Sequence, residues 1–245
     1  MELTPDKTVA EVVTDNIKAS HVFKKYGIDF CCGGGISIAK ACEKKGIDYA
    51  KLEEDLKNLV ADNDQKTNFK NFPLDTLIDY IVEVHHKYVM ANIPLLLQYS
   101  GKVAKVHGDN HPEVKKVYEL FQKVASELAV HMTKEEHVLF PFIKKMVKSE
   151  KEGKEMHFPH FTTVANPIIM MEDEHEEAGN ILKEIASLTN NYTPPKGACN
   201  TFRALYDKLE EFQEDLHQHI HLENNILHPE AVKLEKRLKN RNASR

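Results

Sequence analysis

The chain has 245 residues and a formal net charge of −5, with acidic and basic residues interspersed. This pattern argues against a nucleic-acid-binding surface, which needs a clustered excess of lysine and arginine. No apolar run is long enough to span a membrane as a helix, and the N-terminus lacks the basic start and apolar stretch of a secretory signal. We therefore expect a cytoplasmic protein that binds neither nucleic acid nor a membrane.

Residues 1–60 are expected to form a small helical domain. Apolar residues recur at helical spacing over 8–26, and shorter helices are expected over 36–45 and 49–60. The polar, aperiodic stretch 61–71 is expected to be a linker, because it offers few side chains that could pack into a core.

Residues 72–240 are expected to form a second domain. Four long helical patterns run over 74–105, 112–148, 166–188 and 196–238, and the stretches between them hold the Gly, Pro and Asn residues that end helices. No segment alternates polar and apolar residues long enough to predict a strand. The sequence therefore predicts an all-α protein whose larger part is an up-down-up-down four-helix bundle.

A repeat within the second and fourth of these helices carries the chemical argument. Each copy has the pattern His-x-x-x-Glu, then an aliphatic residue and leucine, then proline ten residues after the histidine. Residues i and i+4 lie on the same face of a helix. His131 and Glu135 can therefore face one point, and His219 and Glu223 can face the same point from another helix.

The other two helices each contribute a histidine that follows a glutamate by three residues. A single His-x-x-x-Glu is usually an exposed ion pair, but its repetition with two further histidines predicts a metal site. Six ligands are too many for one zinc ion, whereas they suit two ions bridged by the carboxylates. Imidazole with carboxylate favours iron or manganese. The predicted ligands are His86, His131, Glu135, His175, His219 and Glu223.

Neighbouring histidines are not expected to bind the metals. His85 points about 100° away from His86 on a helix, so only one of the two can face the site easily. His137, His217 and His221 are each two residues from a predicted ligand and are expected at the surface or at an interface.

The chain resembles the iron–sulfur cluster repair di-iron proteins, the repair-of-iron-centres family. The matching segments are KKYGIDFCCGG at 24–34, HMTKEE at 131–136, LFP at 139–141, MEDEHEEAG at 171–179 and HIHLENN at 219–225, together with His86. The resemblance implies a hemerythrin-like bundle with two iron ions bridged by carboxylates and an oxo group, and it selects His86 over His85. A third glycine and a longer connection at 149–167, with His157 and His160, depart from the family pattern.

The family's implied function is repair of iron–sulfur clusters damaged by nitrosative or oxidative stress, by supply of iron. Its partners would be iron–sulfur proteins with damaged clusters, and the family is commonly a homodimer. Two alternatives stay open: a hemerythrin-like sensor or store of oxygen or nitric oxide (NO), and an enzyme that reduces NO at the di-iron site. The sequence does not decide whether the protein is an enzyme.

Four further residues are candidates for roles beside the metals. Cys31 and Cys32 are adjacent thiols followed by glycines and an expected helix, whose backbone N–H groups can stabilise a thiolate; we predict a role in transfer. Glu127 shares a helix face with His131, and Glu174 precedes His175. Each is either an exposed acid or a group that orients a ligand or passes protons and iron.

Overall fold

The structure, a computed structural model, describes residues 3–60, 69–156 and 163–243. In these ranges the regular elements are helices, with one isolated bridge between Thr8 and Ser37. The predicted all-α fold class is therefore confirmed. Most of the expected linker, and His157 and His160 in the long connection, lie outside the described residues. No described helix combines the length and the apolar character needed to cross a membrane.

The N-terminal region contains four short helices: α1 (Val9–Asp15), α2 (Ala19–Lys25), α3 (Ile38–Lys45) and α4 (Tyr49–Val60). The single helix expected over 8–26 is wrong, because α1 ends at Asp15 and Asn16 has an extended backbone. The Asn16 side chain accepts a hydrogen bond from the Lys18 backbone N–H at 3.2 Å. Such a local bond offers the backbone an alternative to the helix.

Local sequence explains where two of these helices begin. The Thr8 hydroxyl accepts from the Glu11 N–H at 3.1 Å, while the Glu11 carboxylate accepts from the Thr8 N–H at 2.8 Å, so both residues cap α1. Ser37 caps α3 in the same manner through the Lys40 N–H. Gly46 ends α3 in a left-handed conformation, with φ of 65°, which glycine adopts without steric cost.

The rest of the described chain is built from long helices interrupted by short π-helical turns. In order these elements are η1 (Phe69–Asn71, a 3₁₀ turn), α5 (Leu74–Tyr80), η2 (Ile81–His86), α6 (Lys87–His107), α7 (Glu113–Lys134), η3 (Glu135–Leu139), α8 (Phe140–Glu152), α9 (Ala165–Leu188), α10 (Asn200–Leu222), η4 (Glu223–Leu227) and α11 (His228–Ala243).

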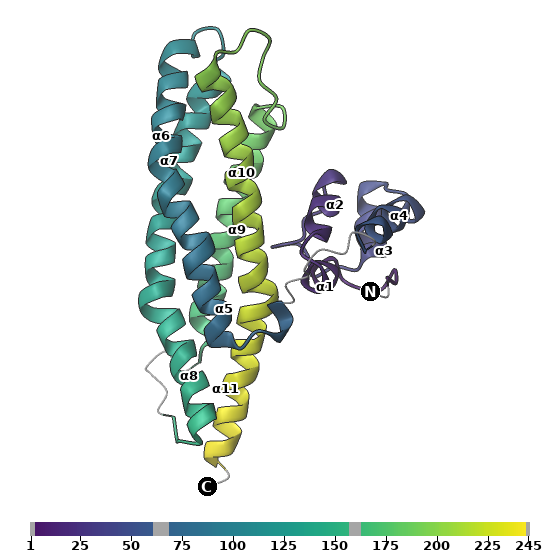
Figure 1. The fold of residues 1–245 in the computed structure, drawn as a ribbon, viewed down its shortest axis with the longest axis vertical. Helices are drawn as coiled ribbons and strands as arrows, with labels where there is room; N and C mark the ends of the chain where they lie inside the picture. Colours follow the sequence, from purple (N-terminus) through teal and green to yellow (C-terminus); the bar gives the residue numbers. More distant parts are fainter. Residues whose placement is uncertain (1–2, 61–68, 157–162, 244–245) are drawn as a thin grey trace. The chain divides into compact units, whose positions relative to one another are not determined.

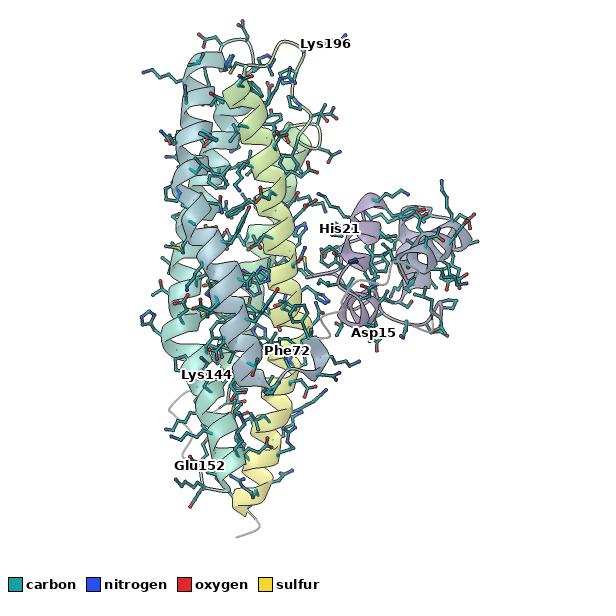
Figure 2. The ribbon with its side chains drawn as sticks, in the orientation of Figure 1. Asp15, His21, Phe72, Lys144, Glu152 and Lys196 are labelled. Carbon is teal, nitrogen blue, oxygen red and sulfur yellow. The ribbon has the colours of Figure 1, made fainter. Side chains whose placement is uncertain are left out.

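The described residues divide into two compact units. In one unit the long helices form a bundle. In that unit α7 packs against both α6 and α9, and α10 runs alongside them (Figure 1). Phe121 and Phe212 meet edge-to-face in its core, with ring centroids 5.5 Å apart. Lys196, between α9 and α10, and Lys144, on α8, lie toward opposite ends of the bundle (Figure 2).

The other unit contains α1–α4, the C-terminal part of α8, the last turns of α10, and α11. Within it, Arg237 of α11 donates to Glu150 of α8 at 2.8 Å, and Arg241 donates to the Ser149 carbonyl at 3.1 Å. The expected domain division, with a linker at 61–71 between residues 1–60 and 72–240, stays a prediction.

Candidate metal centre

Three helices that carry predicted ligands contain a π-helical turn at the ligand: η2 ends at His86, η3 begins at Glu135, and η4 begins at Glu223. In η3 the Phe140 N–H bonds to the Glu135 carbonyl, five residues back, and in η4 the His228 N–H bonds in the same way to Glu223. π-Helical turns are rare and occur often at functional sites.

The repeated proline explains the turns η3 and η4. Pro141 and Pro229 each lie six residues after the glutamate, at the second position of the following α-helix. Proline has no N–H to donate, and its ring clashes with the carbonyl four residues back. A locally wider turn relieves that clash, so the same sequence repeat produces the same backbone feature at both glutamates.

Within the bundle unit, four predicted ligands are buried and lie close together. His86, His131, Glu135 and His175 are each at most 3% exposed. The Glu135 carboxylate lies 3.4 Å from His86 Nε2 and 3.3 Å from His131 Nε2. His131 Nε2 and His175 Nε2 are 2.9 Å apart. Two ligands at right angles around one metal, at bond lengths of about 2.1 Å, would be separated by about 3 Å.

The fourth helix supplies the second pair of the repeat. His219 and Glu223 are both fully buried, and His219 Nε2 lies 3.1 Å from a Glu223 carboxylate oxygen. As the i,i+4 spacing predicts, the two side chains share one face of a continuous helical stretch.

Two groups of buried side chains could each hold a metal ion, with one ligand atom from each residue and all of these atoms within 4.8 Å of one another. One group is His86, Glu135, His219 and Glu223, and the other is His131, Glu135, His175 and Glu223. Each group has its own two histidines, whereas both glutamates are common to the two. This is the arrangement expected of two metal ions bridged by two carboxylates.

Burial and donor chemistry also fit a pair of metal ions. Glu135 and Glu223 are both 0% exposed, and removing two carboxylates from water is costly unless positive charge compensates them. Two metal cations at the shared position would supply that charge. The donors are imidazole nitrogens and carboxylate oxygens, with no thiolate among the two groups.

Two of the histidines have carboxylate partners at their second ring nitrogen. His86 Nδ1 lies 2.8 Å from Glu136, and His131 Nδ1 lies 2.8 Å from Glu174. An ionised carboxylate only accepts, so Nδ1 carries the proton and Nε2 is left to bind a metal. Such partners fix the ring orientation and raise the basicity of the ligating nitrogen.

Glu174 has a second partner, Lys134, which donates to its other carboxylate oxygen. Partial burial favours the neutral form of Glu174, but the hydrogen bonds from Lys134 and His131 outweigh it and hold the carboxyl pKa below its usual value. Glu174 is therefore a carboxylate at neutral pH. This contact corresponds to the predicted orienting role, which stays a prediction.

Comparison with known proteins places the two regions in recognised families. A family model described as "Hemerythrin HHE cation binding domain" matches residues 77–231, which hold all six predicted ligands. A second model, described as "Domain of Unknown function (DUF542)", matches residues 5–60, which hold Cys31 and Cys32.

Full-length relatives match both regions together. The "Iron-sulfur cluster repair protein YtfE" of Escherichia coli O81 (strain ED1a) is 37% identical over 227 residues, which cover 93% of this chain and 97% of that protein. The protein of the same name from Escherichia fergusonii is 36% identical over the same length. The chain belongs to this family of iron–sulfur cluster repair proteins. The family resemblance predicted from the sequence is thereby confirmed.

Glu136 and Lys134 lie beside the metal centre, and neither was predicted from the sequence. Each contacts a residue of another helical segment: Glu136 meets His86, 50 positions away, and Lys134 meets Glu174, 40 positions away. The spacing rules used on the sequence find contacts within one helix, so they could not pair these residues. The only available signal was their position directly beside Glu135.

The neighbouring histidines have different surroundings. His85 is 3% exposed and its Nδ1 lies 2.9 Å from Asp215, and it belongs to neither of the two groups. His137 is exposed, as expected. His221 is fully buried and lies 3.3 Å from Thr14, so it is not at the surface, and its expected place at an interface stays a prediction. Burial lowers the pKa of His221 to about 4, so this imidazole is neutral at pH 7.

The cysteine pair is split between two environments. Cys31 is 5% exposed and its carbonyl accepts from Asn225, whereas Cys32 is exposed. The hydrogen bond with Cys32, then burial, then the charge of Asp29 raise the pKa of the Cys31 thiol well above its usual value. The expected stabilisation of a thiolate by a helix start is therefore wrong for Cys31, since α3 begins only at Ile38.

Glu127 lies on α7 at the partly exposed side of the bundle. Its carboxylate is 3.7 Å from Lys123, which also pairs with Glu177 at 2.7 Å. Among the described contacts none joins Glu127 to His131. Its predicted role beside the metals stays a prediction.

Proposed function

We propose that this protein holds two iron ions at the centre and supplies iron to iron–sulfur proteins whose clusters are damaged by NO or oxidants. The observation that carries the proposal is the pair of buried groups that share Glu135 and Glu223 in a chain of this family. The six proposed ligands are those predicted from the sequence.

The donor set supports iron as the metal. Imidazole and carboxylate together suit iron or manganese, whereas thiolate-selected metals would use sulfur. Bound iron would supply redox and Lewis-acid chemistry at the centre. The protein's own contribution is to hold the ions: Glu136 orients His86, Glu174 orients His131, and the glutamates of the two groups balance the ions' charge.

The direct test is repair of a damaged [4Fe–4S] dehydratase by the iron-loaded protein. We expect the dehydratase to regain activity faster with the iron-loaded protein than with the apo-protein. Glu135→Ala, loaded in parallel, should not support repair. Glu119→Ala is the matched control, because Glu119 is an exposed glutamate of the same α7 helix. Equal recovery with loaded and apo-protein would refute iron supply.

NO consumption separates the alternative of an NO-reducing enzyme. The same loaded protein is given NO and an electron donor in the absence of a client. Under the iron-supply proposal, NO is not consumed beyond about one equivalent of the bound iron. Sustained consumption over many turnovers would instead establish the enzymatic alternative.

The cysteines are proposed to act in transfer and not as bundle ligands. Cys32 is exposed, and neither thiol belongs to the two His/Glu groups. The double change Cys31→Ser, Cys32→Ser should leave the iron content intact and slow the repair of the dehydratase. Loss of iron from that variant would show that the thiols hold metal or maintain the fold.

A cytoplasmic location and a homodimer complete the proposal, and both rest on the family. Light scattering of the purified protein would test the second, with a mass of twice 28.1 kDa as the expected result.

A further inference from the structure

The two metal positions differ in what lies behind their histidines. Behind His86, Glu136 is 37% exposed, and its hydrogen bond to the histidine is the one contact described for its carboxylate. Behind His131, Glu174 is 31% exposed and divides its two oxygens between the histidine and the Lys134 ammonium group. The two carboxylates are otherwise matched in distance to the imidazole.

This difference should weaken cation binding at the position held by His131 relative to the position held by His86. A carboxylate that accepts from a ligating imidazole makes it a stronger donor to the metal. Lys134 partly neutralises the negative charge of Glu174. The donor strength of His131 is therefore raised less by Glu174 than that of His86 is raised by Glu136. The ammonium group also adds a positive charge that only Glu174 and His131 separate from a bound cation. Water screens this charge incompletely, because the setting is part-buried.

The imidazole rings of His86 and His131 also differ in how they are packed, and this adds to the difference between the two positions. The His86 ring stacks on Phe140, with centroids 5.6 Å apart and planes inclined by 26°. His131 meets His175 at 4.6 Å and 59°. His86 is therefore held by an aromatic plane as well as by Glu136. The main contacts described for the His131 ring are to Glu174, Glu135 and another ligand of its own group.

We propose that Lys134 makes the two iron positions unequal, so that the ion held by His131 and His175 leaves first and is the one supplied to a client. The inference rests on the proposed function and deepens it by assigning the transferred ion to one position. Lys134 is then a positioning residue that acts through Glu174 and His131 and sets how readily that ion is released.

The test measures iron release from the full-length, iron-loaded protein to an Fe(II) chelator under anaerobic conditions. We expect two phases of equal amplitude. Lys134→Met removes the charge and keeps most of the apolar stem, and it should slow the fast phase by about 3- to 10-fold while leaving the slow phase unchanged. Lys116→Met is the matched control, since Lys116 lies on the same helix but pairs with the exposed Glu119.

A second pair of variants assigns the phases to positions. Glu136→Gln should accelerate the slow phase, because it weakens the support of His86, and His175→Ala should abolish the fast phase. A single phase in the wild type, an unchanged fast phase in Lys134→Met, or a slow phase that is lost in His175→Ala would overturn the inference. Biphasic, Lys134-dependent release without repair of a client would leave the inequality of the two positions standing, and it would refute the proposed function together with the assignment of the first ion to a client.

Discussion

The His/Glu centre and the Cys31-Cys32 segment both contain residue types that can bind metals, yet the fold places them in opposite environments. At the centre, six side chains from four helices are at most 3% exposed and converge on two positions. In the segment, one thiol is buried and its neighbour is exposed. Spacing of four residues on a helix brings side chains together, whereas adjacency in an irregular segment separates them. The centre therefore gathers buried groups that fit a pair of cations, whereas the segment leaves one thiol exposed.

The largest effect of a substitution on the metals is expected at the shared carboxylates. Glu223→Ala should remove iron from both positions, because Glu223 belongs to both groups. Metal analysis and the visible spectrum of the purified variant measure the loss. Retention of one full iron equivalent would show that Glu223 binds at a single position and does not bridge the two.

A smaller loss is expected when a residue of one group only is changed. His175→Ala should reduce the iron content to about one ion per chain, since the other position keeps both of its histidines. Iron quantification after gel filtration tests this. Complete loss in this variant, with its helical content intact by circular dichroism, would mean that the two positions fill only together.

How far the sequence predicts this molecule depends on the range of each interaction. The His-x-x-x-Glu repeat indicated which faces of two helices carry ligands, because that rule acts within four residues. The break at Asn16 and the π-helical turns were missed, since they depend on a side-chain hydrogen bond and on Pro141 and Pro229. The contact of Glu136 with His86 was inaccessible, because the packing of helices determines it.

The different environments of Cys31 and Cys32 predict unequal reactivity of the two thiols. In a Cys199→Ser background, which removes the other exposed thiol, Cys32 should be alkylated at pH 7 on the order of 10-fold or more faster than Cys31. Cys31 is buried and its pKa is raised, so it is the less reactive protonated thiol until the pH is high. Mass spectrometry of the Cys199→Ser protein that also carries either Cys31→Ser or Cys32→Ser measures the two rates one at a time. Equal rates would contradict the assigned environments.

The smallest effect on the metals is expected from removing the N-terminal region. A chain beginning at Phe72 should keep its iron and its visible spectrum, because all six proposed ligands lie beyond that point. It should lose some stability, since the Asn225 bond to the Cys31 carbonyl and the His221 contacts disappear, at about 1 kcal/mol for each hydrogen bond. Loss of iron or of bundle helicity would place the domain boundary elsewhere.

If one pair of shared carboxylates holds two iron ions, metal analysis of the anaerobically purified wild-type protein will show both ions and their coupling. Elemental analysis together with Mössbauer spectroscopy should give about two iron ions per chain, magnetically coupled through common bridging ligands. A single tightly bound zinc ion, or two iron ions without coupling, would contradict it.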